Sequence, residues 1–314
     1  YGYCAVPENK SLTIEAGTNI HFHANSGLII SKKATLSING EVSNEVIIEG
    51  DRLEPKFSEI PGQWGTIWLR AGSKNNSIKN TIIKNASIGI ISDSIGDILS
   101  PTLTIKNTQI YNSSNFGLLG RETTIEGENL VINNSGQSSL ACIIGGKYNF
   151  THSTFTNFWN NSFREFPSVL INNYFTYFEN NTQIVETRNL YAANFTNCII
   201  DGSNNVELII DKVEGSVFNY SFKNNLLKFN DYNSSYSTIP EYDFTNTTYY
   251  LENILNGKAD FKSPQNNELV IGEKSDAINK ANTQGTLQVS NDILGKLRTF
   301  PADIGAYQHI IFEN

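Results

Sequence analysis

The sequence predicts an all-β fold, a single-stranded right-handed parallel β-helix with a small C-terminal capping segment. Two observations carry this prediction: 42 of the 314 residues are Asn, and one phrase of alternating apolar residues recurs along the chain. The phrase, apolar-x-polar-x-x-apolar, reads IKNTIIKN at 78–85, IKNTQIYN at 105–112 and FTNCIIDG at 195–202. A β-sandwich is the alternative, but sandwiches usually vary strand length and lack a recurring phrase of this kind.

The spacing of the phrase gives the length of one coil. Equivalent apolar residues lie 27, 20, 25, 45 and 27 residues apart by subtraction, and they are Ile78, Ile105, Ile125, Phe150, Phe195 and Phe222. Short strands repeated at intervals of this size are typical of a parallel β-helix, and we interpret the interval of 45 as two coils. Right-handedness is expected because parallel strands are joined by right-handed crossovers.

Tight corners between the strands explain the excess of Asn. This residue tolerates the left-handed backbone conformation, and stacked amides can bond to the coils above and below. We therefore expect corner positions at Asn80, Asn107 and Asn197, and also at His152, which occupies the same slot of the phrase. Phe150 and Phe155 are expected to point inward.

The expected domain organisation is a β-helix over 1–245 and a C-terminal coil and cap over 246–314. Within the β-helix, the first coils near 11–50 are followed by a loop insertion near 51–63. An open end of a β-helix exposes strand edges and a hydrophobic column, so residues 263–314 are expected to cover that end. In this cap we expect Arg298 to form a local ion pair with Asp292 or Asp303.

Composition and charge restrict the partners. The net charge of −8 and pI near 5.1 argue against nucleic acid, which requires clustered Lys and Arg. No apolar stretch is long enough for a transmembrane segment.

Cys142 and Cys198 sit in apolar runs and are expected to be small core residues. The sequence does not begin with Met, so we expect a trimmed form from which any signal peptide has been removed. A monomer is favoured, with the oligomeric state left open.

Residues 12–20, 61–68 and 86–90 resemble right-handed parallel β-helix repeat proteins of the pectin-lyase-like superfamily. The segments SDAINKA (275–281), DILGKLR (292–298) and DIGAY (303–307) resemble the choice-of-anchor Q ending of bacterial surface proteins, although Asp276 stands where the family usually has Pro. The resemblance implies an exported protein that is secreted or held at the cell surface. There it would resemble an outer-membrane lipoprotein, with a lipid anchor upstream. It implies no particular activity.

Catalytic motifs are not found. Enzymes of this superfamily are polysaccharide lyases and hydrolases, which carry paired Asp with Gly-His-Gly, or calcium-binding acids with an Arg base. The nearest approach to a carboxylate pair here is Asp93 with Asp97, which we interpret as a turn. His21 and His23 share the outer face of one strand without a third metal ligand. We therefore expect no catalytic residue, no metal site and no cofactor.

Residues 148–178 hold the highest density of aromatic side chains. Where a loop should leave the coil, the sequence places Trp159, Asn160, Asn161 and Arg164, and these are the expected ligand-binding residues. Aromatic rings with amide neighbours and few charges suit carbohydrate. The alternative is a packed insertion that shields the core.

Together these observations lead us to expect an exported or cell-surface, non-catalytic β-helix that binds a polysaccharide or other glycan. A polysaccharide lyase or glycoside hydrolase is the first alternative, and a structural spacer or adhesin segment is the second. An enzyme should present at least two acidic or basic groups close together in one groove. A binding protein should present exposed aromatic rings in a row.

Overall fold

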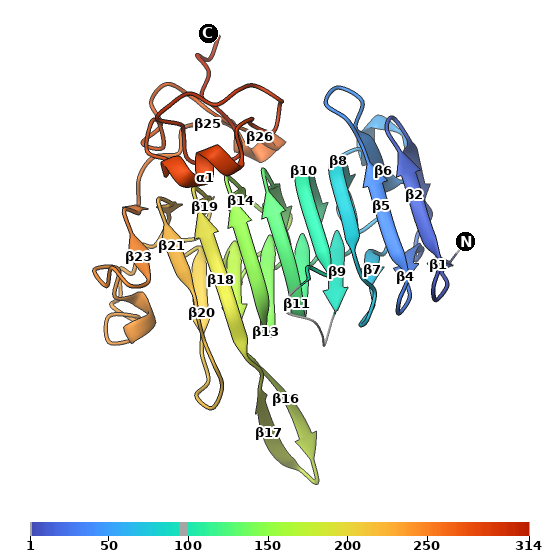
Figure 1. Ribbon diagram of the computed structural model, residues 1–314, viewed down its shortest axis with the longest axis horizontal. Coiled ribbons are helices and arrows are strands. Elements are labelled where there is room, and N and C mark those ends of the chain that lie inside the picture. The colour runs from blue at the N-terminus through green and yellow to red at the C-terminus, as the bar shows by residue number, and fades with distance from the viewer. Residues whose placement is uncertain (1, 94–99, 314) are drawn as a thin grey trace.

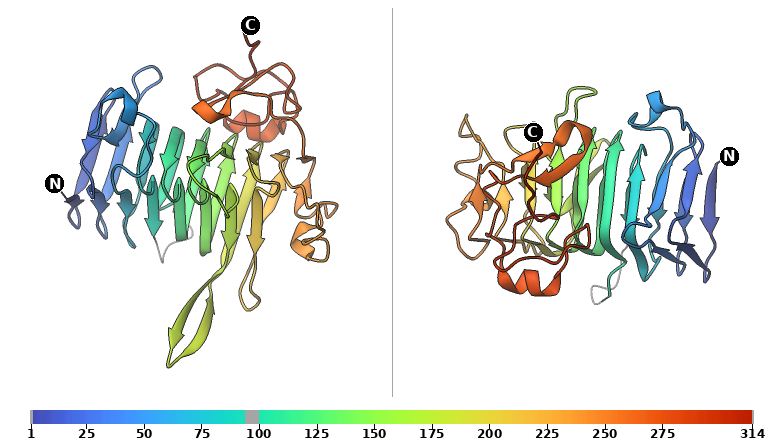
Figure 2. Two further views of the ribbon diagram at one scale, coloured as in Figure 1. Left: turned by 180° about the vertical axis from the view of Figure 1, so that it is seen from behind. Right: turned by 90° about the horizontal axis from the view of Figure 1, so that it is seen from above.

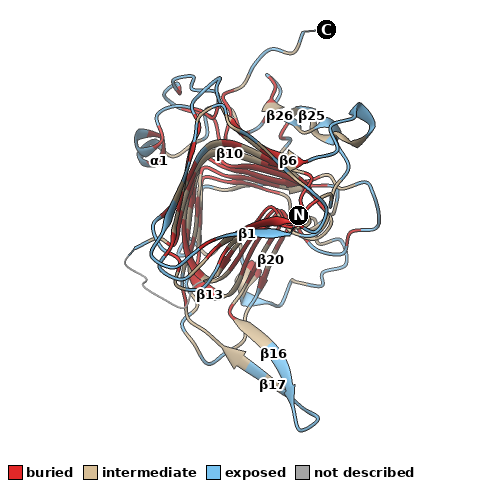
Figure 3. Cartoon of the chain, turned by 90° about the vertical axis from the view of Figure 1, so that its right-hand side faces the viewer, coloured by how far each residue is buried: buried red, intermediate tan, exposed pale blue. Residues whose placement is uncertain are grey.

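The structure, a computed structural model, describes residues 2–93 and 100–313. Strands make up 47% of the chain and helices 5%, and 22 of the strands form one parallel sheet (Figure 1). The sheet coils into the expected all-β parallel β-helix. Viewed along its axis, the coils surround a core of buried residues (Figure 3). Among the described residues no helix is long and apolar enough to cross a membrane.

Each coil except the last contributes a strand to each of three faces, and the last contributes to the second and third only. The first face contains β1 (Tyr3–Val6), β4 (Gly27–Ile30), β7 (Ile67–Leu69), β9 (Ile90–Asp93), the first parts of β11 (Leu118–Glu128) and β13 (Leu140–Thr151), β15 (Val169–Asn172) and β20 (Leu208–Asp211). The second contains β2 (Ser11–Glu15), β5 (Thr35–Asn39), the first parts of β8 (Asn76–Lys84) and β10 (Leu103–Ser113), the second parts of β11 and β13, β18 (Leu190–Thr196), β21 (Ser221–Lys223) and β23 (Tyr250–Leu251). The third contains β3 (Asn19–Phe22), β6 (Val46–Gly50), the second parts of β8 and β10, β12 (Val131–Ser135), β14 (Thr154–Asn157), β19 (Ile199–Gly202), β22 (Leu226–Leu227) and β24 (Ile254–Leu255).

The strand register corrects the expected column of equivalent residues in one place. Gly127, and not Ile125, pairs with both Ile105 and Phe150. A Cβ on Gly127 would lie 2.6 Å from a ring carbon of Phe150, so the glycine makes room for that ring. The complete inward column of the second face is Ile14, Ile38, Ile78, Ile105, Gly127, Phe150, Phe195, Phe222 and Tyr250.

The interval of 45 residues is one coil, and its interpretation as two coils is wrong. Phe150 pairs directly with Phe195, and their ring centroids lie 5.3 Å apart. The extra length leaves the coil as a loop at 158–168 and as the antiparallel hairpin β16 (Tyr174–Glu179) and β17 (Thr182–Thr187). The hairpin projects far from the coils in Figure 1 and in the left view of Figure 2. Insertions at corners therefore lengthen a coil without changing its pairing.

The corner between the second and third faces has the expected left-handed backbone. From β8 onward, the residues there with positive φ are Asn80, Asn107, Asn129, His152, Asn197, Asn224 and Glu252. Amides also bond along the column, since Asn129 Nδ2 donates to Asn107 Oδ1 at 2.9 Å. Phe150 and Phe155 point inward as expected and are fully buried, as are Cys142 and Cys198.

Asn107→Ala is expected to destabilise the protein by about 1–2 kcal/mol, because φ at this position is 48° and a Cβ is strained there. Asn107→Gly keeps the backbone conformation and loses only the amide, so its cost should be smaller. Urea unfolding of both variants measures the difference, with Thr104→Ala on the outer side of the same strand as control. A cost for alanine no larger than for glycine would contradict the corner assignment.

The last coil is closed by residues 230–249, which include η2 (Pro240–Tyr242). The Tyr242 ring packs on Phe229 at 4.9 Å, and its hydroxyl bonds both the N–H and the C=O of Ile210 on the edge strand β20. Phe244 packs on Tyr250 at 4.7 Å. This aromatic segment therefore bonds the edge strand at Ile210 and covers the end of the inward column.

The C-terminal segment lies along the third face, not over the end that we expected it to cover. It contains β25 (Phe261–Ser263), η3 (Pro264–Asn266), β26 (Glu268–Ile271) and α1 (Thr283–Gln288), and it sits above the coils in Figure 1. The outward residues Val131, Ile199 and Leu226 of the third face are buried beneath it. Its capping role is thus to cover an apolar flank of the β-helix.

Corner side chains bond this segment to the coils. Asn197 Nδ2 donates to the carbonyl of Asn282 at 3.1 Å, and His152 Nδ1 lies 3.3 Å from the carbonyl of Gly305. The Asn197 amide also lies 2.9 Å from His152 Nε2. Since that amide donates, His152 carries its proton on Nδ1. Burial holds the pKa of His152 well below its usual value, and the nearby positive charge of Arg298 lowers this pKa further.

Arg298 is fully buried, but it does not form the expected ion pair. Its guanidinium donates to Asn129 Oδ1 at 2.8 Å and to the carbonyls of Gly305 and Ala306, and no carboxylate among the described residues lies within ion-pair distance of it. Burial lowers the pKa of Arg298 to about 10, while Asp292 and Asp303 oppose this shift from a longer range. These two carboxylates accept backbone N–H groups of their own segment instead.

Candidate functional site

A groove of about 370 Å³ follows the corner between the third and first faces in the N-terminal coils. We call it the neutral groove, because none of its lining side chains is charged. Its walls are Tyr3, Ala24, Asn25, Gly62, Trp64, Gly65, Thr66, Trp68, Ser87, Ile88, Ile91 and Asn115. This volume lies within the range of small-ligand sites.

Two aromatic side chains reach the solvent in the neutral groove. Tyr3 on β1 is 44% exposed, and a Cβ on Gly27 would lie 2.6 Å from its ring, so the ring packs on bare backbone. Trp68 faces outward on β7 and is half-buried. Its Nε1 donates to Asp93 Oδ2 at 2.8 Å, which fixes the edge of the indole. The two rings therefore have defined positions before any ligand arrives.

The floor and rim of the neutral groove have different polarity. Trp64 forms the floor and is buried, stacked on Phe22 at 4.8 Å, with its Nε1 donating to the carbonyl of Lys84. Asn25 and Asn115 are exposed on the rim. The groove thus combines an apolar floor with amide groups that can donate and accept hydrogen bonds.

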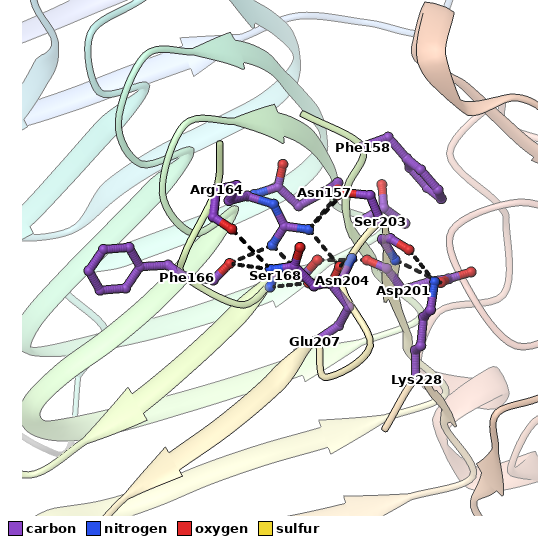
Figure 4. A network of polar contacts seen from close by, with 12 residues as sticks. Asn157, Phe158, Arg164, Phe166, Ser168, Asp201, Ser203, Asn204, Glu207 and Lys228 are labelled. Carbon is purple, nitrogen blue, oxygen red and sulfur yellow. Dashed lines mark hydrogen bonds and ion pairs between the residues drawn. The ribbon is translucent and has the colours of Figure 1, made fainter. Parts of the chain in front are cut away.

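The loop that follows β14 holds the expected ligand-binding residues, and Figure 4 shows its anchor. Arg164 is buried, and its guanidinium donates to Glu207 Oε1 at 2.6 Å and Oε2 at 3.0 Å, and to the carbonyl of Asn157 at 2.9 Å. Glu207 also accepts the N–H groups of Ser168 and Asn204, each at 2.7 Å. Burial raises the pKa of the Glu207 carboxyl, and the hydrogen bonds from Arg164 oppose this shift.

The structure thus separates the four expected residues. Arg164 lies inside the molecule and anchors the loop, so it is corrected from a ligand-binding to a structural side chain. Trp159 is half-buried and its Nε1 donates to Ser162 Oγ at 3.0 Å, while Asn160 and Asn161 are exposed. A ligand role for these three stays a prediction. The loop at 158–168 is therefore anchored to the coils through Arg164 and also presents exposed amide side chains to the solvent.

Trp159 lies in line with the neutral groove. A Cβ on Gly136 would lie 3.3 Å from its ring. Gly136 belongs to the coil after Asn115, since Gln137 N–H donates to the carbonyl of Asn115 at 2.8 Å. The ring of Trp159 therefore contacts the corner of the coil that follows Asn115, the last wall residue of the groove.

A second cleft, of about 300 Å³, is charged and lies where the first face passes to the second. Arg121 pairs with both oxygens of Asp93 at 2.6 and 2.7 Å, and these bonds raise the pKa of Arg121. Arg188 lies 3.4 Å from Glu122. Burial raises the pKa of Glu122, and the charge of Arg188 opposes this shift. Each carboxylate thus faces a guanidinium. Asp97, the other acid of the expected turn, lies outside the described residues.

A third cleft, of about 360 Å³, separates the third face from the C-terminal segment. Asp201 lies 3.5 Å from Lys228 on one wall, and Lys258 lies 2.6 Å from Asp260 on the other. Burial raises the pKa of Asp201, and Lys228 opposes that shift. Each wall of this third cleft therefore carries its own ion pair.

The two His residues considered as metal ligands each lie beside an acidic side chain. His21 on the outer side of β3 lies 3.7 Å from Glu49, and His23, which follows β3, lies 2.7 Å from Asp51. In the described part of the chain, no group of three or more His, Cys, Asp or Glu side chains is arranged to hold a metal ion.

The neutral groove was not predicted from the sequence. The segment 61–68 (PGQWGTIW) supplies Gly62, Gly65 and two Trp residues to it, but from the sequence this segment was interpreted only as a resemblance to β-helix repeat proteins. A signal was available, because glycines beside aromatic residues indicate exposed backbone on which rings can pack. A comparison of the chain with protein-family models gives no match, and a comparison with curated protein sequences gives none either.

Proposed function

We propose that the protein is a non-catalytic glycan-binding β-helix whose ligand lies in the neutral groove. The observation that carries the proposal is a groove with one exposed and one half-buried aromatic ring, an amide rim and no charged wall residue. Sugar rings present C–H faces that pack on aromatic side chains, and their hydroxyls need partners that both donate and accept. Tyr3 and Trp68 supply the first kind of contact, and Asn25 and Asn115 the second.

The ligand we propose is a neutral polymer that lies along the β-helix axis. Trp159 continues the line of the groove and carries Asn160 and Asn161 beside it. Coils are stacked at roughly 5 Å, so side chains from successive coils can contact successive parts of an extended chain. An acidic polymer is disfavoured, since the protein has a net charge of −8 and none of the residues that line the groove is cationic; Arg70, over the Trp68 ring, lies outside that lining.

The cellular setting belongs to the same proposal. An exported protein, secreted or held at the cell surface by a lipid anchor upstream, would meet polysaccharide there. Support comes from the Asn-, Ser- and Thr-rich, Cys-poor composition and from the resemblance to bacterial surface β-helix proteins.

The alternative of a polysaccharide lyase or hydrolase has one observation in its favour, the charged cleft with Asp93 and Glu122. Glycosidases need two carboxylates that face one sugar, one as acid and one as base or nucleophile. Here both oxygens of Asp93 accept hydrogen bonds from Arg121, so the carboxylate is directed at a guanidinium. The arrangement therefore favours a structural role for the pair.

Trp68→Ala is expected to weaken glycan binding at least about tenfold, equivalent to about 1.4 kcal/mol, because it removes the central aromatic surface. Retention on a soluble β-glucan, a galactomannan and a xylan, with polygalacturonate as the acidic comparison, measures the effect. Tyr232→Ala is a matched control, since Tyr232 is 76% exposed and lies outside the groove.

The same incubations are assayed for new reducing or unsaturated ends. Binding without cleavage supports the proposal, and cleavage of any of the four polymers overturns its non-catalytic part. Retention of none of them would favour a structural spacer, and equal retention of wild type and Trp68→Ala would overturn the assignment of binding to the neutral groove.

A further inference from the structure

Three side chains on consecutive coils form a chain of charged hydrogen bonds beside the neutral groove. Trp68 on β7, Asp93 on β9 and Arg121 on β11 all face outward from the first face. Trp68 Nε1 donates to Asp93 Oδ2 at 2.8 Å, and Arg121 grips both oxygens of the same carboxylate at 2.6 and 2.7 Å. The strand register places these groups one coil apart.

The geometry restricts the indole strongly. The side chain of Asp93 is 17% exposed, so its bond to the indole is shielded from water on most sides. A paired hydrogen bond from a planar guanidinium fixes the plane of the carboxylate, and that plane then fixes the direction of the indole N–H. Arg70 adds a contact over the ring at 5.5 Å. Free rotation of Trp68 would break at least one charged hydrogen bond.

We propose that Asp93 and Arg121 are positioning residues that hold the Trp68 ring in its ligand-binding orientation; this inference rests on the function proposed above. They belong to the charged cleft and touch no ligand in the neutral groove. Their effect is preorganisation, which improves binding by removing the cost of ordering a side chain when the ligand arrives. Arg121 orients the Asp93 carboxylate, and that carboxylate in turn orients the Trp68 indole.

The first test needs no ligand. The protein has three Trp residues, so a ¹⁵N-labelled sample gives three indole N–H signals, and Trp68→Phe assigns one of them. In Asp93→Ala the Trp68 signal should shift and exchange faster with water, while those of Trp64 and Trp159 stay in place and report an intact fold. An unchanged Trp68 signal overturns the inference.

The second test measures binding to the same β-glucan, galactomannan and xylan. Asp93→Ala should lose about three- to tenfold in affinity. Asp93→Asn keeps an oxygen acceptor for the indole and should recover part of that loss, and Arg121→Lys, which cannot make the paired bond, should fall between wild type and Arg121→Ala. If Asp93→Ala binds like wild type while Trp68→Ala does not, the positioning role is refuted and the groove stands.

The two proposals can therefore fail separately. Wild-type binding by Trp68→Ala overturns the glycan groove, and with it any ligand role for Asp93 and Arg121. Should Asp93→Ala not fold, Arg121→Ala replaces it in both tests, because Arg121 is 38% exposed and its loss leaves the Asp93 carboxylate free to be hydrated.

Discussion

Arg164→Ala is expected to lower the free energy of unfolding by about 3–5 kcal/mol, well above the loss expected for Asn107→Ala. The side chains of Arg164 and Glu207 are 2% and 0% exposed, so removal of the Arg leaves a carboxylate buried without its counter-charge. Two backbone N–H groups would remain on that carboxylate, and they cannot replace a guanidinium. Urea unfolding followed by circular dichroism gives the loss.

A matched exposed pair serves as the control. Lys262 and Glu268 lie 2.9 Å apart and are 48% and 47% exposed, so Lys262→Ala should cost less than about 1 kcal/mol. The double variant Arg164→Met with Glu207→Leu should be more stable than Arg164→Ala, because it leaves no unpaired charge. A loss below about 1 kcal/mol for Arg164→Ala would show that the loop at 158–168 does not depend on this pair.

Acid is expected to loosen the C-terminal segment through His152. Its pKa in the folded state is held well below 6.5, so between that lowered pKa and 6.5 the unfolded chain binds more protons than the folded one. Stability is therefore complete above about pH 6.5 and falls as the pH decreases, by at most about 1.4 kcal/mol per pH unit for this one group. A protonated Nε2 would also place a donor against the Asn197 amide.

His152→Asn is the informative variant, since Asn occupies this corner in neighbouring coils and tolerates the φ of 49°. Thermal unfolding between pH 7.5 and 5 should show a shallower loss for the variant than for wild type. Thr104→Ala, on the outer side of β10 and without a titratable group, should keep the wild-type slope. Equal slopes for wild type and His152→Asn would refute the assignment of the acid sensitivity to this imidazole.

The fold could be predicted from the sequence because a β-helix repeats its physical constraints in every coil. Left-handed corners select Asn, and inward positions select apolar side chains, so Asn107 and Phe150 identify their places without a structure. The register could not be predicted as well. Gly127 has no side chain to mark it as part of the inward column, and the insertions before Phe195 look in a sequence like an additional coil.

The candidate site was less predictable, because its contacts join distant parts of the chain. Arg164 resembles a surface residue in a polar loop, and only its partner Glu207, 43 residues later, shows that it is buried. The neutral groove brings Tyr3 together with Asn115 across several coils. Local composition identifies an aromatic or an amide, whereas the stacking of coils decides which of them meet.

The single coil that carries two insertions shows how this architecture separates two geometric variables. A side chain's position along the axis is set by the number of its coil, since Phe150 and Phe195 stay paired whatever lies between them. Its distance from the axis is set by the length of chain added at a corner, as the projecting hairpin β16–β17 shows in Figure 1. Spacing and reach are therefore encoded in different stretches of sequence. Either can change in evolution or in design while the other is kept.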